Sequence, residues 1–285
     1  MYLHRVMAKP SFNLYFVSDT QIGNLLVYEK GIQEMIARVL SDKDAHVIFV
    51  GDCIDGIMMN DKRFYDETAN PVTKAKPLLE AKYFIELFKP IAHKMDVILW
   101  GNHDKFLWRF GNLVKDEICS SLGVAYGGYV SKIQYVDTNG NPMFKAYAAH
   151  GRKGISSTAD DVHRRRTNKE LILKRHLQDM AGDCIIMVKG HNHQLLSLEP
   201  TPELYLTDDG EELVQNYTRA KQNVGPNERI HPALRFYGCS GSFLRSQMIG
   251  VDSYVEEAEL PPVVLGYLMA HVRDREVVRL EEITV

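Results

Sequence analysis

The stretch HVIFVGDCID, residues 46–55, decides the fold that we predict. It opens with a run of mostly β-branched and aromatic residues and turns polar at Gly51-Asp52. A short apolar run that stops at such a turn is typical of a strand buried on both faces of a sheet. Three other stretches have the same form: residues 12–18 before Asp19, 95–100 before Gly101-Asn102, and 184–188 before Gly190-His191.

The segments around these strands predict helices and a second set of strands. Four apolar residues share one helical face in residues 31–40, namely Ile32, Met35, Ile36 and Val39. We also expect helices at 77–88 and 105–122, a hairpin of 130–136 with 143–149 around Asn139-Gly140, and strands at 234–237, 263–272 and 276–280. Strand-helix alternation followed by a β-rich part predicts an α/β fold in which a second, mixed sheet packs on the first.

The sequence also predicts the domain organisation of the chain. No fixed-period repeat or flexible linker separates two parts, so we expect a single domain over residues 1–285. Residues 152–180 are predicted to be a basic helical insertion, in which Thr158 to Asp161 begins a helix. Its buried stripe would be Leu173, Leu177 and Met180. Residues 208–230 are predicted to be a polar, exposed loop.

Composition excludes several classes of protein. The 285 residues carry a formal net charge of −3 and 45% hydrophobic residues, which gives no global attraction to nucleic acid or to a membrane surface. The four cysteines are widely spaced, which indicates reduced thiols and a cytoplasmic protein. The first residues lead into no apolar signal region, and no 18-residue apolar stretch occurs. We therefore expect no membrane partner.

The polar clusters that follow the strands carry the chemistry. There are five: Asp19-Thr20-Gln21, Gly51-Asp52-Cys53-Ile54-Asp55, Gly101-Asn102-His103-Asp104, His150-Gly151 and Gly190-His191-Asn192-His193. Any single Asp here is better explained as a turn or capping residue, and any single His as a half-buried, hydrogen-bonded one. Together they supply the Asp, Asn, Gln and His side chains that bind divalent metals. Because ligand sites form where the carboxyl ends of α/β strands converge, the combination predicts a dinuclear metal site.

In these motifs the sequence resembles the calcineurin-like metallophosphoesterase superfamily, whose pattern is D-x-H, GDxxD, GNH[DE], an isolated H and GHxH. The resemblance spans Asp19 to His193 and implies a four-layer α/β/β/α sandwich with two metals at the sheet edge. It also implies which residues are ligands. The first metal would be held by Asp19, Gln21, Asp52 and His193, and the second by Asp52 as a bridge with Asn102, His150 and His191.

The same resemblance implies the catalytic residues. His103 would lie over the substrate phosphate and assist the leaving group, with Asp104 orienting its imidazole. Two cations about 3.5–4 Å apart would activate a bridging water and clamp the phosphoryl oxygens. Gln21 departs from the family pattern, which has His there. Because its carbonyl oxygen is harder than imidazole, we expect Mn²⁺ first, or Mg²⁺, rather than tightly held zinc or iron.

A basic segment after His150 bears on the substrate. Residues 152–176 hold eight Lys or Arg against three acidic residues, a local balance of +5. It is either an ordinary solvated helix face or a cationic rim for a phosphate ester, with Arg152 as the best direct contact and Arg165 and Arg166 as weaker ones. The predicted function is hydrolysis of a phosphodiester or phosphomonoester, with nucleotides and nucleic acid included as substrates. The alternatives are a DNA or RNA nuclease and a non-catalytic, metal-stabilised scaffold.

Overall fold

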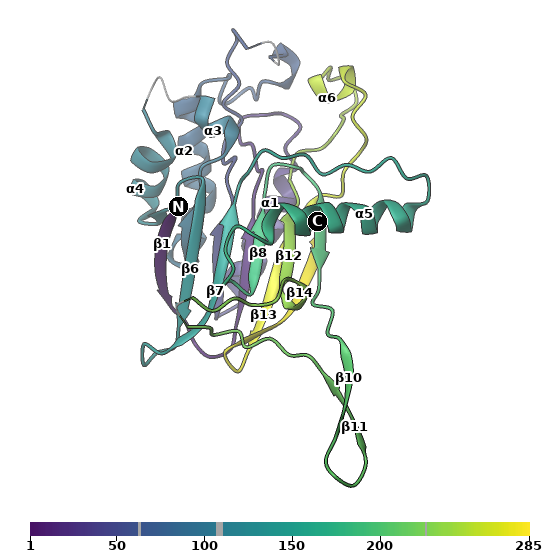
Figure 1. The fold of residues 1–285 in the computed structure, drawn as a ribbon. Coiled ribbons are helices and arrows are strands. Elements are labelled where there is room, and N and C mark those ends of the chain that lie inside the picture. The colour runs from purple at the N-terminus through teal and green to yellow at the C-terminus, as the bar shows by residue number, and fades with distance from the viewer. Residues whose placement is uncertain (62–63, 107–110, 226) are drawn as a thin grey trace.

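In the computed structural model, two six-stranded mixed sheets pack face to face, with helices on their outer faces (Figure 1). The structure describes residues 1–61, 64–106, 111–225 and 227–285. The predicted α/β fold of two mixed sheets flanked by helices is confirmed. Among the described residues, no helix combines the length and the apolar character needed to cross a membrane.

The first sheet has the spatial order β14-β13-β2-β3-β4-β5. Strands β2 to β5 are parallel, and β13 and β14 are antiparallel to their neighbours. The bounds of its strands are β2 Phe12–Val17, β3 Ala45–Phe49, β4 Met95–Ile98, β5 Ala125–Tyr126, β13 Gly266–Arg273 and β14 Glu276–Thr284.

The second sheet has the order β1-β6-β7-β8-β12-β9. Its strands are β1 Tyr2–Met7, β6 Val130–Val136, β7 Pro142–Ala149, β8 Ile186–Lys189, β9 Leu195–Leu198 and β12 Phe236–Ser240. A separate two-stranded ribbon, β10 Leu204–Asp208 with β11 Leu213–Tyr217, projects away from both sheets (Figure 1).

The helices follow the strand order. They are α1 Glu29–Ser41, α2 Pro77–Phe88, α3 Asn102–Phe106, α4 Ser120–Leu122, α5 Val162–Leu177 and α6 Tyr254–Glu257. Short turns of other helical types are η1 Asp66–Thr68, η2 Lys89–Lys94, the π-helical η4 Val114–Cys119 and η5 Pro232–Leu234.

Three apolar clusters hold these layers together. One lies between the two sheets, where β2, β3 and β13 face β6, β7 and β8. A second packs α1 and α2 on the outer face of the first sheet, and a third packs α5 on the outer face of the second sheet. The order of layers is therefore helix, sheet, sheet, helix, as the alternation of buried residues along the strands requires.

Most predicted elements are present. The apolar face of α1 is buried as predicted, α2 has the predicted bounds, and Gly123 ends α4 in the left-handed conformation. In the hairpin turn, the Asp137 carboxylate accepts the N–H groups of Asn139 and Asn141. The long helix predicted at 105–122 is not continuous: α3 ends at Phe106, residues 107–110 lie outside the described part, and η4 and α4 follow.

Two predictions in the basic and polar segments are corrected. Helix α5 starts at Val162 rather than at Thr158, and the carboxylate of Asp161 caps it by accepting the N–H of Arg164. Leu173 and Leu177 are buried, but Met180 lies beyond the helix and is half exposed. The loop predicted at 208–230 begins inside a regular ribbon instead, because β10 and β11 pair from Leu204 to Tyr217.

Candidate metal centre

The proposed ligands lie at one end of both sheets. Asp19 and Asp52 follow β2 and β3, which are parallel neighbours in the first sheet, and Asn102 opens α3 after β4. His150 and His191 follow β7 and β8, which are parallel neighbours in the second sheet. The carboxyl ends of strands from two packed sheets therefore bring these side chains together, as the sequence predicts.

The tightest group is formed by His150, Asp52 and Asn102. His150 Nε2 lies 3.0 Å from Asn102 Oδ1 and 3.2 Å from Asp52 Oδ2. On the other side of the ring, Nδ1 lies 2.8 Å from the carbonyl oxygen of Val50. Since a carbonyl can only accept, Nδ1 carries the proton, and Nε2 is the nitrogen available to a metal.

His191 joins this group from the second sheet. Atoms of Asp52, His150 and His191 that can bind a metal all lie within 4.8 Å of one another. Burial and the charge of His150 lower the pKa of His191 to about 4, so its imidazole is neutral at pH 7. A neutral imidazole, a second imidazole whose Nε2 faces the site and a carboxylate form a donor set suited to a divalent transition metal.

Asp19, Gln21 and His193 form a second group beside the first. Asp19 is fully buried, and its Oδ2 accepts the Ser18 hydroxyl at 2.5 Å and the His191 N–H at 3.0 Å. Its Oδ1 accepts no hydrogen bond from any residue in the described ranges, although His193 Nε2 lies 3.3 Å away. The Gln21 amide nitrogen lies 3.3 Å from the same Nε2. A buried carboxylate oxygen without a donor, next to an imidazole and an amide, fits a cation.

The backbone at these positions is unusual. Five of the seven predicted ligands have positive φ angles although none is glycine, a conformation that costs on the order of 1–3 kcal/mol each. They are Asp19 (50°), Gln21 (43°), Asp52 (54°), His191 (75°) and His193 (52°). Such strain persists where the surrounding structure enforces it, which is typical of functional sites.

Two glycines of the motifs are required by close approach. A Cβ on Gly101 would lie 1.9 Å from Asp52 Oδ1. A Cβ on Gly190 would lie 2.9 Å from the Val50 carbonyl oxygen and 3.0 Å from His150 Nδ1. Any larger residue at either position would displace a proposed ligand, which explains why the polar clusters contain glycine here.

Asp52 and His150 form a buried ion pair. Burial alone raises the pKa of Asp52, but the charges of His150 and His103 outweigh it and bring that pKa below its usual value. Burial alone lowers the pKa of His150, yet the Asp52 carboxylate raises it to about 9. A negative charge is therefore held at the centre of the site, where a cation would replace the proton of His150 as its partner.

His103 lies beside Asp52, but a different residue orients its ring. The His103 N–H donates to Asp52 Oδ1 at 2.9 Å, and ring atom Nδ1 donates to the Asp55 carbonyl oxygen at 2.6 Å. Asp55 Oδ1 is 3.8 Å from the same Nδ1. The expectation that Asp104 orients the imidazole is thus corrected: the neighbour of the ring is Asp55, from the second polar cluster.

Asp104 instead holds the loops of the site. Its buried carboxylate accepts N–H groups from Gly101 at 2.8 Å, Asp52 at 3.0 Å and Ile54 at 3.3 Å. Burial and the charge of Asp52 raise the pKa of Asp104 to about 7, although the hydrogen bonds from these backbone N–H groups lower that pKa in part. Asp104 therefore ties the loop after β3 to the loop after β4, and through them fixes Asp52 and Asn102.

The three predicted substrate-binding arginines lie apart from one another. Arg152 is exposed, two residues after His150. Arg165 and Arg166 lie on α5, and their guanidinium groups already have partners in the protein. Arg165 donates to the carbonyls of Ala159 and Asp160, and Arg166 pairs with Glu170 and Glu282. Among the three, Arg152 alone makes no hydrogen bond or ion pair with a described residue, and it lies two residues from a proposed ligand.

Supporting residues outside the motifs are harder to find from sequence. Ser18 Oγ lies 2.6 Å from Ser240 Oγ, and the Ser242 hydroxyl donates to the Asp19 carbonyl at 3.1 Å. Buried Lys189 donates to the Lys153 carbonyl at 2.7 Å and so holds the loop after His150.

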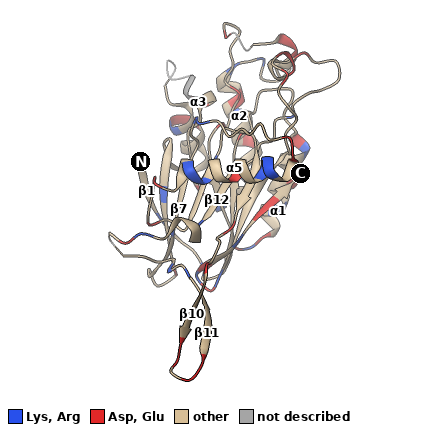
Figure 2. Ribbon diagram, turned by 45° about the vertical axis from the view of Figure 1, so that its right-hand side comes forward, with Lys and Arg blue, Asp and Glu red and all other residues tan. Residues whose placement is uncertain are grey.

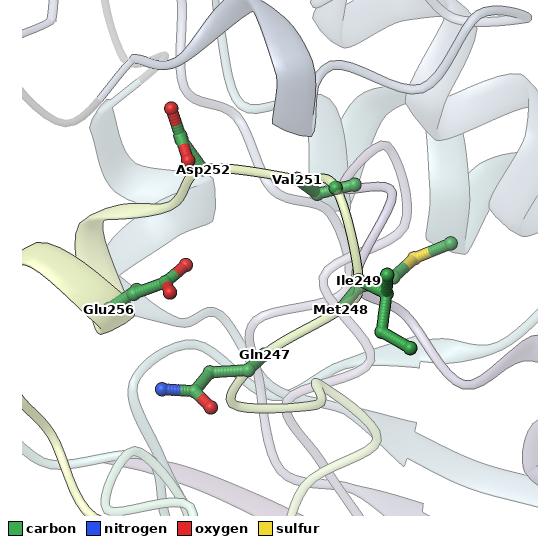
Figure 3. A pocket seen from close by; sticks show the side chains of 7 residues that line it. Gln247, Met248, Ile249, Val251, Asp252 and Glu256 are labelled. Atoms are coloured by element: carbon green, nitrogen blue, oxygen red, sulfur yellow. The ribbon is translucent and has the colours of Figure 1, made fainter.

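A separate pocket of about 350 Å³ is formed by residues 247–252 and Glu256, before and within α6. Figure 3 shows the carboxylates of Asp252 and Glu256 together with Met248 and Ile249 around it. None of the predicted site residues lines this pocket, so we assign it no part in the metal centre.

Comparison with known protein families identifies the family of the chain. A family model described as calcineurin-like phosphoesterase matches residues 12–222, so the chain belongs to that family. No curated protein matches the sequence.

Three similar solved structures have low sequence identity. A predicted phosphoesterase from Streptococcus pneumoniae TIGR4 is 11% identical, with 96% of this chain and 98% of that chain covered and a TM-score of 0.32. NAD nucleotidase from Haemophilus influenzae is 9% identical, with 96% and 50% covered and a TM-score of 0.41. A nuclease from Pseudomonas putida is 12% identical, with 95% and 87% covered and a TM-score of 0.33.

Proposed function

We propose that this chain is a dinuclear-metal-dependent phosphohydrolase that cleaves a phosphomonoester or phosphodiester. The observation that carries the proposal is the convergence of Asp52 and Asn102 from one sheet with His150 and His191 from the other. Four side chains of types that bind metals meet in one small volume, and two of them have positive φ. Packing or turn formation alone does not explain this arrangement.

The proposed ligands divide into two sets that share Asp52. The first set is Asp19, Gln21, Asp52 and His193, and the second is Asp52, Asn102, His150 and His191. When bound, two divalent cations would lower the pKa of a water molecule and neutralise charge on the phosphoryl oxygens. The carboxylates of Asp19 and Asp52 attract the cations, while the neutral oxygen of Asn102 leaves the site positive enough for an anionic substrate.

His103 is the proposed general acid. Its Nδ1 is occupied by the Asp55 carbonyl, so Nε2 is the atom that can give a proton to the leaving oxygen. The His103 backbone N–H also holds Asp52 Oδ1, which couples the position of the acid to that of the bridging carboxylate.

Two residues beside the site indicate which metal it prefers and which side chain contacts the substrate phosphate. Gln21 offers an amide oxygen where imidazole would favour zinc, so we propose Mn²⁺ or Mg²⁺. Arg152 is the cation placed to meet a phosphate oxygen, because it is exposed and follows His150 by two residues. Nucleotides and nucleic acid are included among the proposed substrates.

The test is hydrolysis of p-nitrophenyl phosphate and bis-p-nitrophenyl phosphate by protein stripped of metal and then supplied with Mn²⁺, Mg²⁺ or Zn²⁺. We expect turnover that depends on added metal and is highest with Mn²⁺. Single-stranded DNA and nucleotides, assayed in parallel, separate a nuclease from a small-ester hydrolase. Metal binding without turnover of any ester would contradict the proposal and support a non-catalytic scaffold.

A further inference from the structure

The ribbon formed by β10 and β11 is highly exposed: all five residues of β10 and three of the five of β11 are exposed. We call residues 203–218 the arm. Its base is closed by the Thr218 N–H, which donates to the Glu203 carbonyl at 2.9 Å, and its strands pair from Leu204–Tyr217 to Asp208–Leu213. Figure 1 shows the arm extending away from both sheets, and none of its residues belongs to the three apolar clusters. An isolated two-stranded ribbon is at best marginally stable in water.

One face of the arm is apolar. Residues paired directly across an antiparallel ribbon point to the same side, so the register places four large apolar side chains on one face. They are Leu204, Leu206, Leu213 and Tyr217, with exposed fractions of 52%, 58%, 72% and 58%. An exposed apolar face of this kind on a regular element marks an interaction surface.

The tip of the arm is acidic. Asp208, Asp209, Glu211 and Glu212 surround the turn, and residues 203–217 contain no Lys, Arg or His. None of these four carboxylates forms an ion pair with a described residue. Figure 2 shows this acidic tip at the far end of the ribbon. Such a tip repels nucleic acid and anionic membranes, and it selects a cationic protein surface.

The same chain carries a cationic groove that matches the arm. It has a volume of about 570 Å³ and lies between α5 and residues 261–264; we call it the α5 groove. Val162, Arg165, Arg166 and Lys169 of α5 line one side, and two prolines and two valines line the other, Pro261 to Val264. Residues 162–167 are all exposed, so this half of α5 is open to a partner.

The charges of the groove favour carboxylates. Arg166 is neutralised by Glu170 and Glu282, but Arg165 keeps its charge while donating to two carbonyl groups. Lys169 forms no ion pair with any residue in the described ranges. The apolar wall at 261–264 offers a counterpart to Leu206 and Leu213. An acidic tip with an apolar face therefore meets a cationic groove with an apolar wall.

We propose that the arm of one copy docks into the α5 groove of a second copy of this chain, reciprocally, to form a two-fold symmetric dimer. Reciprocal docking forms the same contact twice, which is how self-complementary surfaces close into a dimer rather than a filament. The docked tip occupies the solvent beside Arg165, and Arg152 stays outside the groove lining.

The first test is the mass of the protein in solution by light scattering. We expect twice the 32.5 kDa of one chain. The arm variant E211K/E212K and the groove variant R165E/K169E should each weaken dimerisation at least about tenfold, or 1.4 kcal/mol. Combining the two variants should restore the dimer, because opposite charges then face each other again. The control E86K/E117K changes two exposed acids elsewhere and should remain dimeric.

A cross-link tests the geometry independently. The four native cysteines are buried, so Glu212→Cys combined with Lys169→Cys should give a covalent dimer under mild oxidation, whereas Glu86→Cys with Lys169→Cys should not. Circular dichroism checks that each variant is folded. A wild-type monomer at the highest attainable concentration overturns the proposal. A dimer that persists in both charge-reversal variants also overturns it, and so does a disulfide that forms within one chain instead of between two.

Discussion

The two halves of the proposed metal centre are prepared to different degrees by the protein. In the half formed by Asp52, Asn102, His150 and His191, His150 is held by the Val50 carbonyl, and Asp52 accepts the His103 N–H. In the other half, Asp19 Oδ1 has no hydrogen-bond donor among described residues, and Gln21 and His193 contact each other at 3.3 Å. The His193 side chain is 25% exposed, against 1% for His150.

This difference indicates how each half depends on its cation. Where hydrogen bonds already orient the ligands, little reorganisation is needed when a metal binds, so affinity is high. Where a buried carboxylate oxygen accepts no hydrogen bond from a described residue, the cation itself completes the local structure. We therefore expect the half around His150 to bind first and the half around Gln21 to limit activity at low metal concentration.

The largest effect is expected from His150→Ala. It removes one ligand and leaves the buried Asp52 carboxylate without its partner, so activity should fall by about 10³-fold or more and one cation should be lost. Esterase kinetics and metal content by mass spectrometry measure the two effects. His193→Ala weakens the half that limits activity, so this variant should keep more activity at saturating metal than His150→Ala but lose it at a higher metal concentration than wild type does. The comparison between the halves is wrong if the two variants behave alike.

His103→Ala should give the next largest effect. Because His103 is proposed to transfer a proton and not to bind metal, turnover should fall by about 10²–10⁴-fold while both cations stay bound. The matched control is His93→Ala, which removes an exposed histidine from η2. If the His103 variant loses metal as well, its role is structural.

Gln21→His should strengthen the weaker half. Imidazole binds borderline metals better than an amide oxygen does, so affinity for Zn²⁺ at that half should rise about tenfold, or 1.4 kcal/mol, relative to Mn²⁺. Isothermal titration calorimetry with each metal measures the change. Gln33→His on the exposed face of α1 is the control. An unchanged preference would remove Gln21 from the ligand set.

Glu80→Gln should alter stability and not metal affinity. Glu80 is buried and accepts the Gly56 N–H at 2.9 Å; burial and the charge of Asp55 raise its pKa to about 8. The folded protein thus binds this proton more tightly than the unfolded chain, whose pKa is 4.5. The stabilisation by the protonated form is complete below pH 4.5 and is lost as pH rises through 8.

The variant removes that pH dependence. Relative to wild type, Glu80→Gln should be about 2–4 kcal/mol more stable at pH 9 and nearly unchanged at pH 4. Urea unfolding of metal-free protein at both pH values measures the difference. If the stability difference between the variant and wild type is the same at both pH values, folding does not raise the pKa of Glu80.

Much of the fold was accessible from sequence where the apolar pattern is strong. Strands β2, β3 and β4, helices α1 and α2 and the β6–β7 hairpin were predicted near their observed bounds because buried faces constrain those residues. Strand β1 was not predicted, because it is an exposed edge strand whose residues alternate weakly. The arm was missed for the same reason: no core selects its pattern.

The site likewise has features that the sequence predicts and features that it does not. The motifs named the side chains that meet at Asp52, since metal binding and phosphate chemistry demand particular residue types at strand ends. They did not show which neighbour orients His103. Asp104 is adjacent to His103 in the sequence, whereas Asp55 lies 48 residues earlier in another motif, and only the path of the loops after β3 and β4 brings Asp55 to the ring.

By itself, the sequence determined the class of fold, the chemical identity of the candidate metal-binding side chains and the order in which they follow the strands, because these depend on local pattern and residue type. Only the tertiary structure decided that Asp55 holds the imidazole, that Arg165 and Arg166 already have partners, and that an apolar arm faces solvent. Those outcomes depend on contacts between residues far apart in the chain, and no local pattern encodes such distances.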